Sequence, residues 1–252
     1  MNIMKIAWLF PDTLYLHGER GNILALSRFG KLAGFETQVD KIDFNTEAFN
    51  PEDYDCIFCP PGEIASFTEV INWLKSYEAN LKAFIEEGKP LIVTGTSVGM
   101  WTKVINRVDG SKIEGLGILN AETVENENVY GDDNYFKTTY NGREMEIIGN
   151  QIQMVDFINH GEEAFGQLIY GYGNSGKDRE EGFKVNNSIF TNTLAPMLVC
   201  NPWLTEEIVN VVAANKGLDK IEFAEDHKIE EQSMETKKNF ILTKVTRLTN
   251  CK

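Results

Sequence analysis

The sequence predicts an α/β fold in which a mostly parallel sheet carries helices on both faces, with additional short antiparallel strands. The first observation is that short apolar runs alternate with amphipathic stretches between Lys5 and Gly95. Strands buried on both faces have this apolar composition, and their alternation with helices is typical of parallel sheets. The second is the change after residue 110, where short period-two segments indicate hairpins. We expect one domain over residues 1–215 and a charged C-terminal extension over 216–252, whose packing is not predicted.

The first strand and helix are predicted before residue 35. Lys5–Phe10 is short and apolar, and a loop with proline and aspartate follows it. Apolar residues then recur at helical spacing up to Gly34, which can cap the helix: Ile23, Leu24, Leu26, Phe29 and Leu32. Glu36–Ile42 and the CIFC run at 56–59 are the second and third strands.

A second helix is predicted from the amphipathic run Thr68–Gly88. Ser66 and Glu69 have the spacing of a capping box ahead of it, and Gly88 can end it. Leu91–Gly95 follows as a fourth buried strand. Because open parallel sheets bind ligands outside the carboxyl ends of their strands, three loops are expected on one functional rim: 11–22, 60–66 and 94–98.

The remainder is predicted to form hairpins and one helix. Asn141-Gly142 is a typical two-residue hairpin turn. Pro202–Asn215 is the last helix that the periodicity predicts.

Composition excludes several classes of function. The net charge of −14 repels phosphate backbones and anionic membrane surfaces, so we expect no nucleic-acid partner and no membrane insertion. The apolar run Ile6–Phe10 is far shorter than a span of about 20 residues, and we place the protein in the cytoplasm. Cys56 and Cys59 have C-x-x-C spacing, but on a strand they point to opposite faces, so we expect core cysteines, no metal and no cofactor.

The segment LIVTGTSVGMW, residues 91–101, predicts a strand, a tight turn and a helix. An elbow of this kind presents a side chain, here Thr94, at the edge of the sheet, and backbone N–H groups at the helix start can stabilise an oxyanion. Glycine-containing turns occur in all parallel α/β proteins, so this signal alone is weak.

Several further segments occur in a fixed order along the chain. They are LYLHGERGNILAL, IEGLGIL, FINHGEE, GYGNSGKDREEGF and TNTLAPMLVCNP, between about Pro11 and Pro202. In order and spacing they resemble the motifs of the CobB/CobQ-type class I glutamine amidotransferases, and most of all those of the GatD-type glutaminase subunits of lipid II isoglutaminyl synthase. The resemblance implies a flavodoxin-like fold and a glutaminase site that passes ammonia to a Mur-ligase-like synthetase subunit.

The resemblance also implies where the catalytic groups should lie, and this sequence departs from it there. The elbow of the family reads C-G-G-Y-Q, and its nucleophilic cysteine aligns with Thr94. The histidine of the L-H-G-P motif aligns with Leu194, and Pro60-Pro61-Gly62-Glu63 stands where the relatives carry the G-G-G-Q oxyanion loop. Threonine without a base is a poor nucleophile, leucine is no base, and proline has no N–H to donate.

Other positions match the family outside the catalytic pair. For the glycines we favour turn formation, whereas the polar residues either form buried hydrogen bonds or keep a ligand or docking surface. The candidate pocket residues are Arg20, Asn22, Gly62, Glu63, Gly95, Asn159, His160 and Asn174.

Two hypotheses follow. The first is a pseudo-glutaminase that has lost hydrolysis but keeps the fold, a Mur-ligase-like partner and a role in peptidoglycan biosynthesis, with glutamine or another small molecule as a possible ligand. The second is an active amidotransferase or hydrolase with a relocated nucleophile, namely Thr94, Thr96, Ser97 or Cys59. That second reading needs a base, for which His160 is the family-matched candidate.

Overall fold

The computed structural model describes residues 2–250, with side chains described as far as residue 244. Within this range the centre is a six-stranded sheet, sheet A, parallel except where β11 pairs with β12. Its order is β11-β12-β4-β3-β1-β2. The strands are β1 (Ile3–Leu9), β2 (Glu36–Ile42), β3 (Cys56–Cys59), β4 (Leu91–Thr94), β11 (Phe183–Val185) and β12 (Ser188–Thr191). The predicted α/β class is confirmed, as are the four strands predicted before residue 100.

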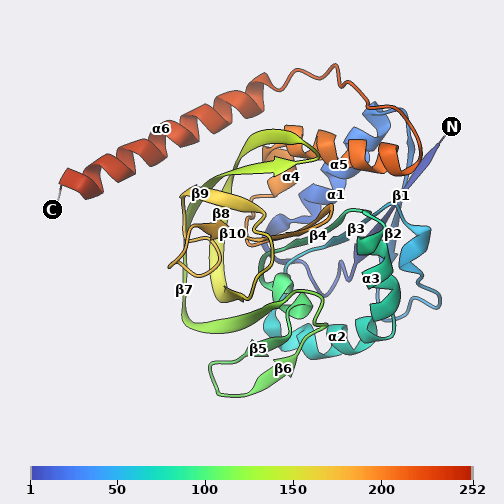
Figure 1. The fold of residues 1–252 in the computed structure, drawn as a ribbon, viewed down its shortest axis with the longest axis horizontal. Helices are drawn as coiled ribbons and strands as arrows, with labels where there is room; N and C mark the ends of the chain where they lie inside the picture. Colours follow the sequence, from blue (N-terminus) through green and yellow to red (C-terminus); the bar gives the residue numbers. More distant parts are fainter. Residues whose placement is uncertain (1, 251–252) are drawn as a thin grey trace.

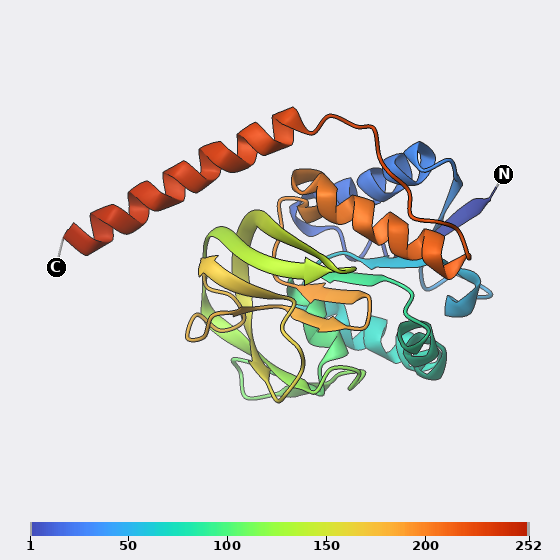
Figure 2. The same cartoon turned by 45° about the horizontal axis from the view of Figure 1, so that its top comes forward.

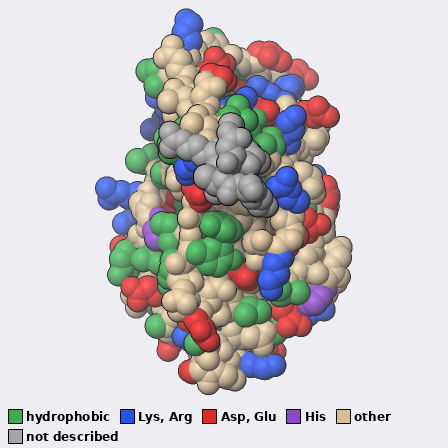
Figure 3. Space-filling view, turned by 90° about the vertical axis from the view of Figure 1, so that its left-hand side faces the viewer, with side chains coloured by type: hydrophobic (Ala, Val, Ile, Leu, Met, Phe, Trp, Pro, Cys, Tyr) green, Lys and Arg blue, Asp and Glu red, His purple; other side chains and the backbone are tan. Residues whose placement is uncertain are grey.

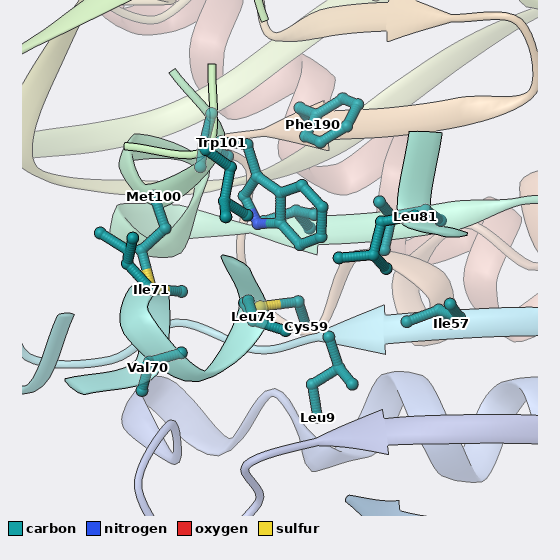
Figure 4. Close-up of a cluster of buried hydrophobic side chains, with 14 of the residues drawn as sticks. Leu9, Ile57, Cys59, Val70, Ile71, Leu74, Leu81, Met100, Trp101 and Phe190 are labelled. Atoms are coloured by element: carbon teal, nitrogen blue, oxygen red, sulfur yellow. The ribbon is translucent and has the colours of Figure 1, made fainter. Parts of the chain in front are cut away.

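Helices cover both faces of sheet A (Figures 1 and 2). One face carries α1 (Arg20–Leu32), α4 (Met197–Cys200) and α5 (Pro202–Asn215), and the other carries α2 (Phe67–Lys75) and α3 (Glu78–Glu86). Cys56 packs in the core below α1 and α5, whereas Cys59 packs in the opposite core with Trp101 and Leu74 (Figure 4). The two thiols therefore lie on opposite faces, as predicted.

A second sheet, sheet B, follows in the order β10-β9-β7-β5-β6, with β8 paired to β7. Its strands are β5 (Val104–Asn106), β6 (Lys112–Glu114), β7 (Ala121–Tyr140), β8 (Arg143–Asn159), β9 (Gly166–Tyr170) and β10 (Glu180–Glu181). Asn141 and Gly142 join β7 to β8 with φ of +49° and +76°, the left-handed pair that a tight hairpin turn requires. The hairpin is longer than predicted, since pairing continues through the acidic segment 125–134 across an irregularity between Glu125 and Tyr130.

Two predictions about the second helix are wrong. Ser66 does not cap α2, because its hydroxyl donates to Glu63 O (2.8 Å) from within a preceding 3-10 turn, η3 (Ile64–Ser66). The run Thr68–Gly88 is not one helix but breaks between α2 and α3. Trp73 and Tyr77 flank the break, and both rings pack on Phe49, with ring centroids 5.6 and 5.2 Å apart.

The C-terminal extension contains a further helix, α6 (Lys228–Asn250), so α5 is not the last one. Its few apolar residues among many charges give weak periodicity, which is why the sequence did not predict it. A non-helical segment, 216–227, connects α5 to α6, which extends past the body of the molecule (Figures 1 and 2). Over the described residues, no helix is long and apolar enough to cross a bilayer.

Candidate functional site

The predicted elbow is present at the end of β4. Gly95 turns the chain at φ +62° into η4 (Gly95–Trp101), a buried 3-10 segment rather than an α-helix. A Cβ atom on Gly95 would lie 2.8 Å from Pro61 Cβ and 3.2 Å from Leu194 Cδ2, so only glycine fits. Pro61 and Leu194 thus both pack against the residue that follows Thr94. The three positions that differ from the family motifs meet at one place.

The rim loop presents carbonyl groups to the elbow. Thr96 Oγ1 donates to Gly62 O (2.6 Å), and Ser97 Oγ donates to Pro60 O (2.7 Å). Both hydroxyls are therefore engaged in holding the loop. An oxyanion hole needs N–H donors aimed at the reacting atom, and here the loop offers acceptors.

Thr94 lies beside a buried carboxyl group. Glu19, just ahead of α1, is 1% exposed, and its carboxyl accepts from Asn22 Nδ2 (2.6 Å) and from Ala195 N (3.0 Å). Burial raises the pKa of Glu19 to about 7, against the opposing effects of hydrogen bonds from Ala195, Asn22 and Thr94. Within the described residues Thr94 Oγ1 has no hydrogen bond of regular geometry, so its link to Glu19 is the weakest of the three. Thr94 itself is fully buried.

The segment around Leu194 is held firmly. Leu194 N donates to Asn150 O (2.8 Å) and Leu194 O accepts from Asn150 N (3.3 Å). Ala195 has φ of +98°, a left-handed value that costs a side-chain-bearing residue about 1–3 kcal/mol. Its N–H donates to Glu19 and its carbonyl accepts from Cys200 Sγ (2.8 Å), and these contacts maintain the strained conformation.

We expect Ala195→Gly to stabilise the protein. Glycine relieves the strain at φ +98° but loses more backbone entropy on folding, which leaves a net gain of about 1 kcal/mol in the free energy of unfolding. Urea denaturation measures it. Ala33→Gly is the matched control, because Ala33 has φ of −74° and should lose stability on the same substitution. A loss of similar size in both variants would contradict the strain at Ala195.

A pocket of about 450 Å³ opens beside the elbow. It is lined by His17, Asp132, Asp133, Asn150, Gln151, Ile152, Leu194 and Ala195. Glu19 and Thr94 do not line it, since Leu194 and Ala195 stand at its wall. Partial burial lowers the pKa of His17, which favours its neutral form at the pocket.

Comparison with known proteins identifies relatives over most of the chain. This chain is 28% identical over 225 residues to the lipid II isoglutaminyl synthase (glutamine-hydrolyzing) subunit GatD of Staphylococcus aureus. The alignment covers 86% of this chain and 88% of that protein. The chain is therefore similar to GatD-type glutamine amidotransferase subunits over most of its length. GatD of Streptococcus pneumoniae is 23% identical over 221 residues, covering 84% of this chain and 82% of that protein. No family model matches the GatD-like chain.

Two solved structures align with most of the chain. PurLQS from Thermotoga maritima has a TM-score of 0.48 at 11% identity, covering 85% of the GatD-like chain and 97% of its own. The glutaminase domain of Trypanosoma brucei CTPS with bound acivicin also has a TM-score of 0.48, at 14% identity, covering 86% and 96%.

The structure brings some of the predicted site residues of the GatD-like chain together at the elbow. Gly62 and Gly95 lie there. Asn22 is linked to this place because its Nδ2 donates to Glu19, and its Oδ1 accepts from Leu198 N (2.9 Å). Arg20 and Glu63 are exposed near the same rim. The three rim loops therefore meet as predicted, with Leu16 N donating to Pro61 O (3.1 Å).

Other predicted residues hold turns of sheet B. Asn159 Oδ1 accepts from Gly161 N and Glu162 N at 2.9 and 2.8 Å. Asn174 is fully buried and forms a two-way pair with the backbone of Gly182 (2.7 and 3.3 Å). These contacts are those of structural asparagines.

His160 is placed away from the elbow hydroxyls. The ring Nε2 of His160 lies 3.4 Å from Glu122 Oε1 on an exposed part of sheet B, and the backbone N–H of His160 donates to Asn120 O (3.0 Å). Thr96 and Ser97 donate to carbonyls instead. The structure therefore does not join His160 to either hydroxyl as a base.

The cysteines have the surroundings of core residues. Burial raises the pKa of Cys59 to about 12, and burial also raises the pKa of the half-buried Cys200. A thiol that stays protonated at neutral pH is a weak nucleophile. Among the residues that the structure describes, no cluster of histidine, cysteine and carboxylate side chains is arranged to bind a metal ion.

Sequence reasoning missed Glu19 and His17 as site residues. Both lie in LHGERGN, where the family motif reads Y-G-D-R-G-N, so Glu19 takes the position of the motif's acidic residue. That match was the available signal for Glu19. No sequence signal indicated that His17 would line the pocket, because its position depends on a left-handed φ of +60° in η1 (Leu16–Gly18).

Proposed function

We propose that this GatD-like chain is a non-hydrolytic subunit that acts with a Mur-ligase-like synthetase subunit in amidating a cell-wall precursor. The proposal takes its reaction from the names of the two GatD relatives, which span more than four-fifths of the chain. In this proposal the two subunits form a cytoplasmic heterodimer, and the pocket beside the elbow binds glutamine or another small ligand.

The single observation that carries the loss of hydrolysis is the closure of the elbow around Thr94. The Thr94 side chain has no exposed surface, and Leu194 and Pro61 pack on the adjacent Gly95. A glutamine amide would have to reach a hydroxyl that is out of contact with the pocket. The rim loop also turns two carbonyls toward the elbow, where they accept from Thr96 and Ser97, whereas an oxyanion needs donors.

A second candidate function, hydrolysis through a relocated nucleophile, has support at one residue. Thr96, Ser97 and Cys59 are engaged or protonated, but Thr94 has Glu19 beside it, and a carboxyl with a pKa of about 7 is in the range of a general base. This favours Thr94 among the alternatives. Access is the obstacle, because Glu19 and Thr94 are both at most 1% exposed.

The test is a glutaminase assay on the purified protein, alone and with the synthetase subunit that co-purifies with it from its native cell. We expect no release of glutamate above background in either case. Thr94→Val and Cys59→Ala are the controls, since both side chains are buried and the changes are close in volume. Glutamate release that either variant abolished would contradict the proposal. If no Mur-ligase-like protein co-purified with the chain, the proposed partner would be contradicted.

A further inference from the structure

Helix α6 lies against sheet B beside the pocket, and a lysine side chain anchors it there. Lys237 Nζ donates to Gly149 O (3.1 Å) and to Asn150 Oδ1 (2.8 Å), and it lies 3.1 Å from Asp133 Oδ1. An ammonium group has three N–H donors, so this seat satisfies it completely. The helix is thus attached through a specific ammonium site on the strands that border the pocket.

Two further lysines continue the attachment along the helix. Lys244 pairs with Asp132 and with Asp133 Oδ2 (3.1 Å), and the hydrogen bonds that its ammonium group donates to these carboxylates raise its pKa. Lys238 Nζ lies 2.7 Å from Glu146 Oε2. Acidic and basic side chains are interspersed over this side of the molecule (Figure 3).

These contacts involve the wall of the pocket itself. Asp132, Asp133 and Asn150 belong to the eight residues that line it. All three are bound by Lys237 or Lys244. Without α6, Asp132 keeps its hydrogen bond from Tyr170 Oη (2.6 Å) and Asp133 keeps that from Asn150 Nδ2 (3.3 Å). The position of α6 therefore decides whether these three side chains are also bound by lysine or can offer that position to a ligand.

Apolar packing contributes little along the described part of the helix. Ile241 is buried at 2% exposure and Met234 is partly buried. Ile229 and Phe240 are 79% and 54% exposed. A helix docked by its apolar face would bury such side chains.

A cavity also lies beneath the first half of α6. It measures about 860 Å³ and lies between the β7–β8 hairpin and the helix, which contributes Glu231, Met234 and Glu235 to its lining. Interfaces packed like a protein core leave only small voids. The helix is consequently held at separate points by charge rather than by a continuous packed surface.

We propose that α6 is a releasable strap whose lysines hold the acidic wall of the pocket, so that breaking these ion pairs frees the helix and uncovers Asp132, Asp133 and Asn150. The inference rests on the proposed function only in treating the pocket as a ligand site. The strap itself is independent of whether the chain hydrolyses glutamine. The side chains of these ion pairs are 12–30% exposed, so they stay in contact with solvent and are weakened by salt, which makes this attachment reversible.

Hydrogen exchange of the α6 amides in the full-length protein tests the release. Lys237→Met combined with Lys244→Met should speed exchange over residues 230–244 about tenfold, and about 1 M NaCl should do the same to the unaltered protein. Lys31→Met combined with Lys112→Met is the matched control, because both lysines are exposed on other elements and should leave α6 unchanged. Unchanged exchange in the first variant and in salt would overturn the proposal.

Carbodiimide labelling of carboxyl groups, read by mass spectrometry on the same samples, tests the uncovering. Asp132 and Asp133 should label several-fold faster when α6 is released. Asp109, which is exposed, and Glu181, which is fully buried, are the fast and unreactive references within each molecule. Faster labelling without faster α6 exchange would mean that the lysines only shield the carboxylates, and the strap would be excluded. Neither readout depends on glutamine, so a positive glutaminase assay would leave this result intact.

Discussion

Replacing Glu19 by glutamine is expected to remove a pH dependence of stability worth on the order of 3 kcal/mol between pH 4.5 and about 7. The folded-state pKa of Glu19 is raised above its ordinary value, because the carboxyl is buried. Its contribution to stability is therefore fully present below pH 4.5 and is lost as pH rises through about 7. The protonated form also has an O–H to donate, and Thr94 Oγ1 is the neighbouring oxygen without a regular hydrogen bond.

The measurement is the difference in free energy of unfolding between the native protein and Glu19→Gln, from urea titrations across this range. The readout is the slope of this difference against pH, not its absolute size. The amide N–H₂ of glutamine would face the N–H donors of Asn22 or Ala195, which adds a cost that is the same at every pH. Glu125→Gln is the control. A hydrogen bond from Arg107 holds the pKa of Glu125 low. The difference in free energy of unfolding between the native protein and Glu125→Gln should therefore be constant above about pH 6 and change only at lower pH. A flat difference for Glu19→Gln would show that its carboxyl titrates normally.

The fold of the central sheet could be predicted because most of its early strands are short, self-contained apolar runs. Glu36–Ile42 is the exception, since it is a more polar strand at the edge of the sheet. The sequence predicts three of these strands directly: Glu36–Ile42, the CIFC run and the strand ending at Thr94. Parallel pairing places their carboxyl ends on one rim. The break between α2 and α3 could not be read in the same way. Trp73 and Tyr77, which flank it, pack on Phe49, and this contact with another segment of the chain leaves no mark in the helical periodicity.

The site was predictable only in part for a related reason. Motif spacing placed Thr94, Leu194 and the two prolines on the rim, and Gly95 does lie in contact with Pro61 and Leu194. That Glu19 reaches Thr94 and Ala195 depends on burial and on loop geometry, which no periodicity reports. The ion pairs of α6 likewise join residues more than 80 positions apart.

Thr94→Cys alone is expected to leave glutamine hydrolysis below detection. A nucleophile and its base act as a unit, and losing either one costs on the order of 10⁶-fold in turnover. Leu194 lies next to the elbow, the motif resemblance aligns it with the base of the family, and leucine accepts no proton. The adjacent carboxyl of Glu19 is a further obstacle, because a nearby negative charge raises the pKa of an introduced thiol.

Thr94→Cys combined with Leu194→His should recover a small fraction of a glutaminase rate, detectable as glutamate release over Leu194→His alone. The recovery stays small because Pro60 and Pro61 have no N–H to donate, and a missing oxyanion donor costs about 10²–10³-fold. Replacing both prolines by glycine in the double variant should then add activity. High activity in Thr94→Cys alone would contradict this account and identify another base, for which Glu19 beside residue 94 is the first candidate. The order of recovery thus separates the three proposed losses, since Thr94 adjoins Gly95 in the chain and Pro61 and Leu194 lie beside it.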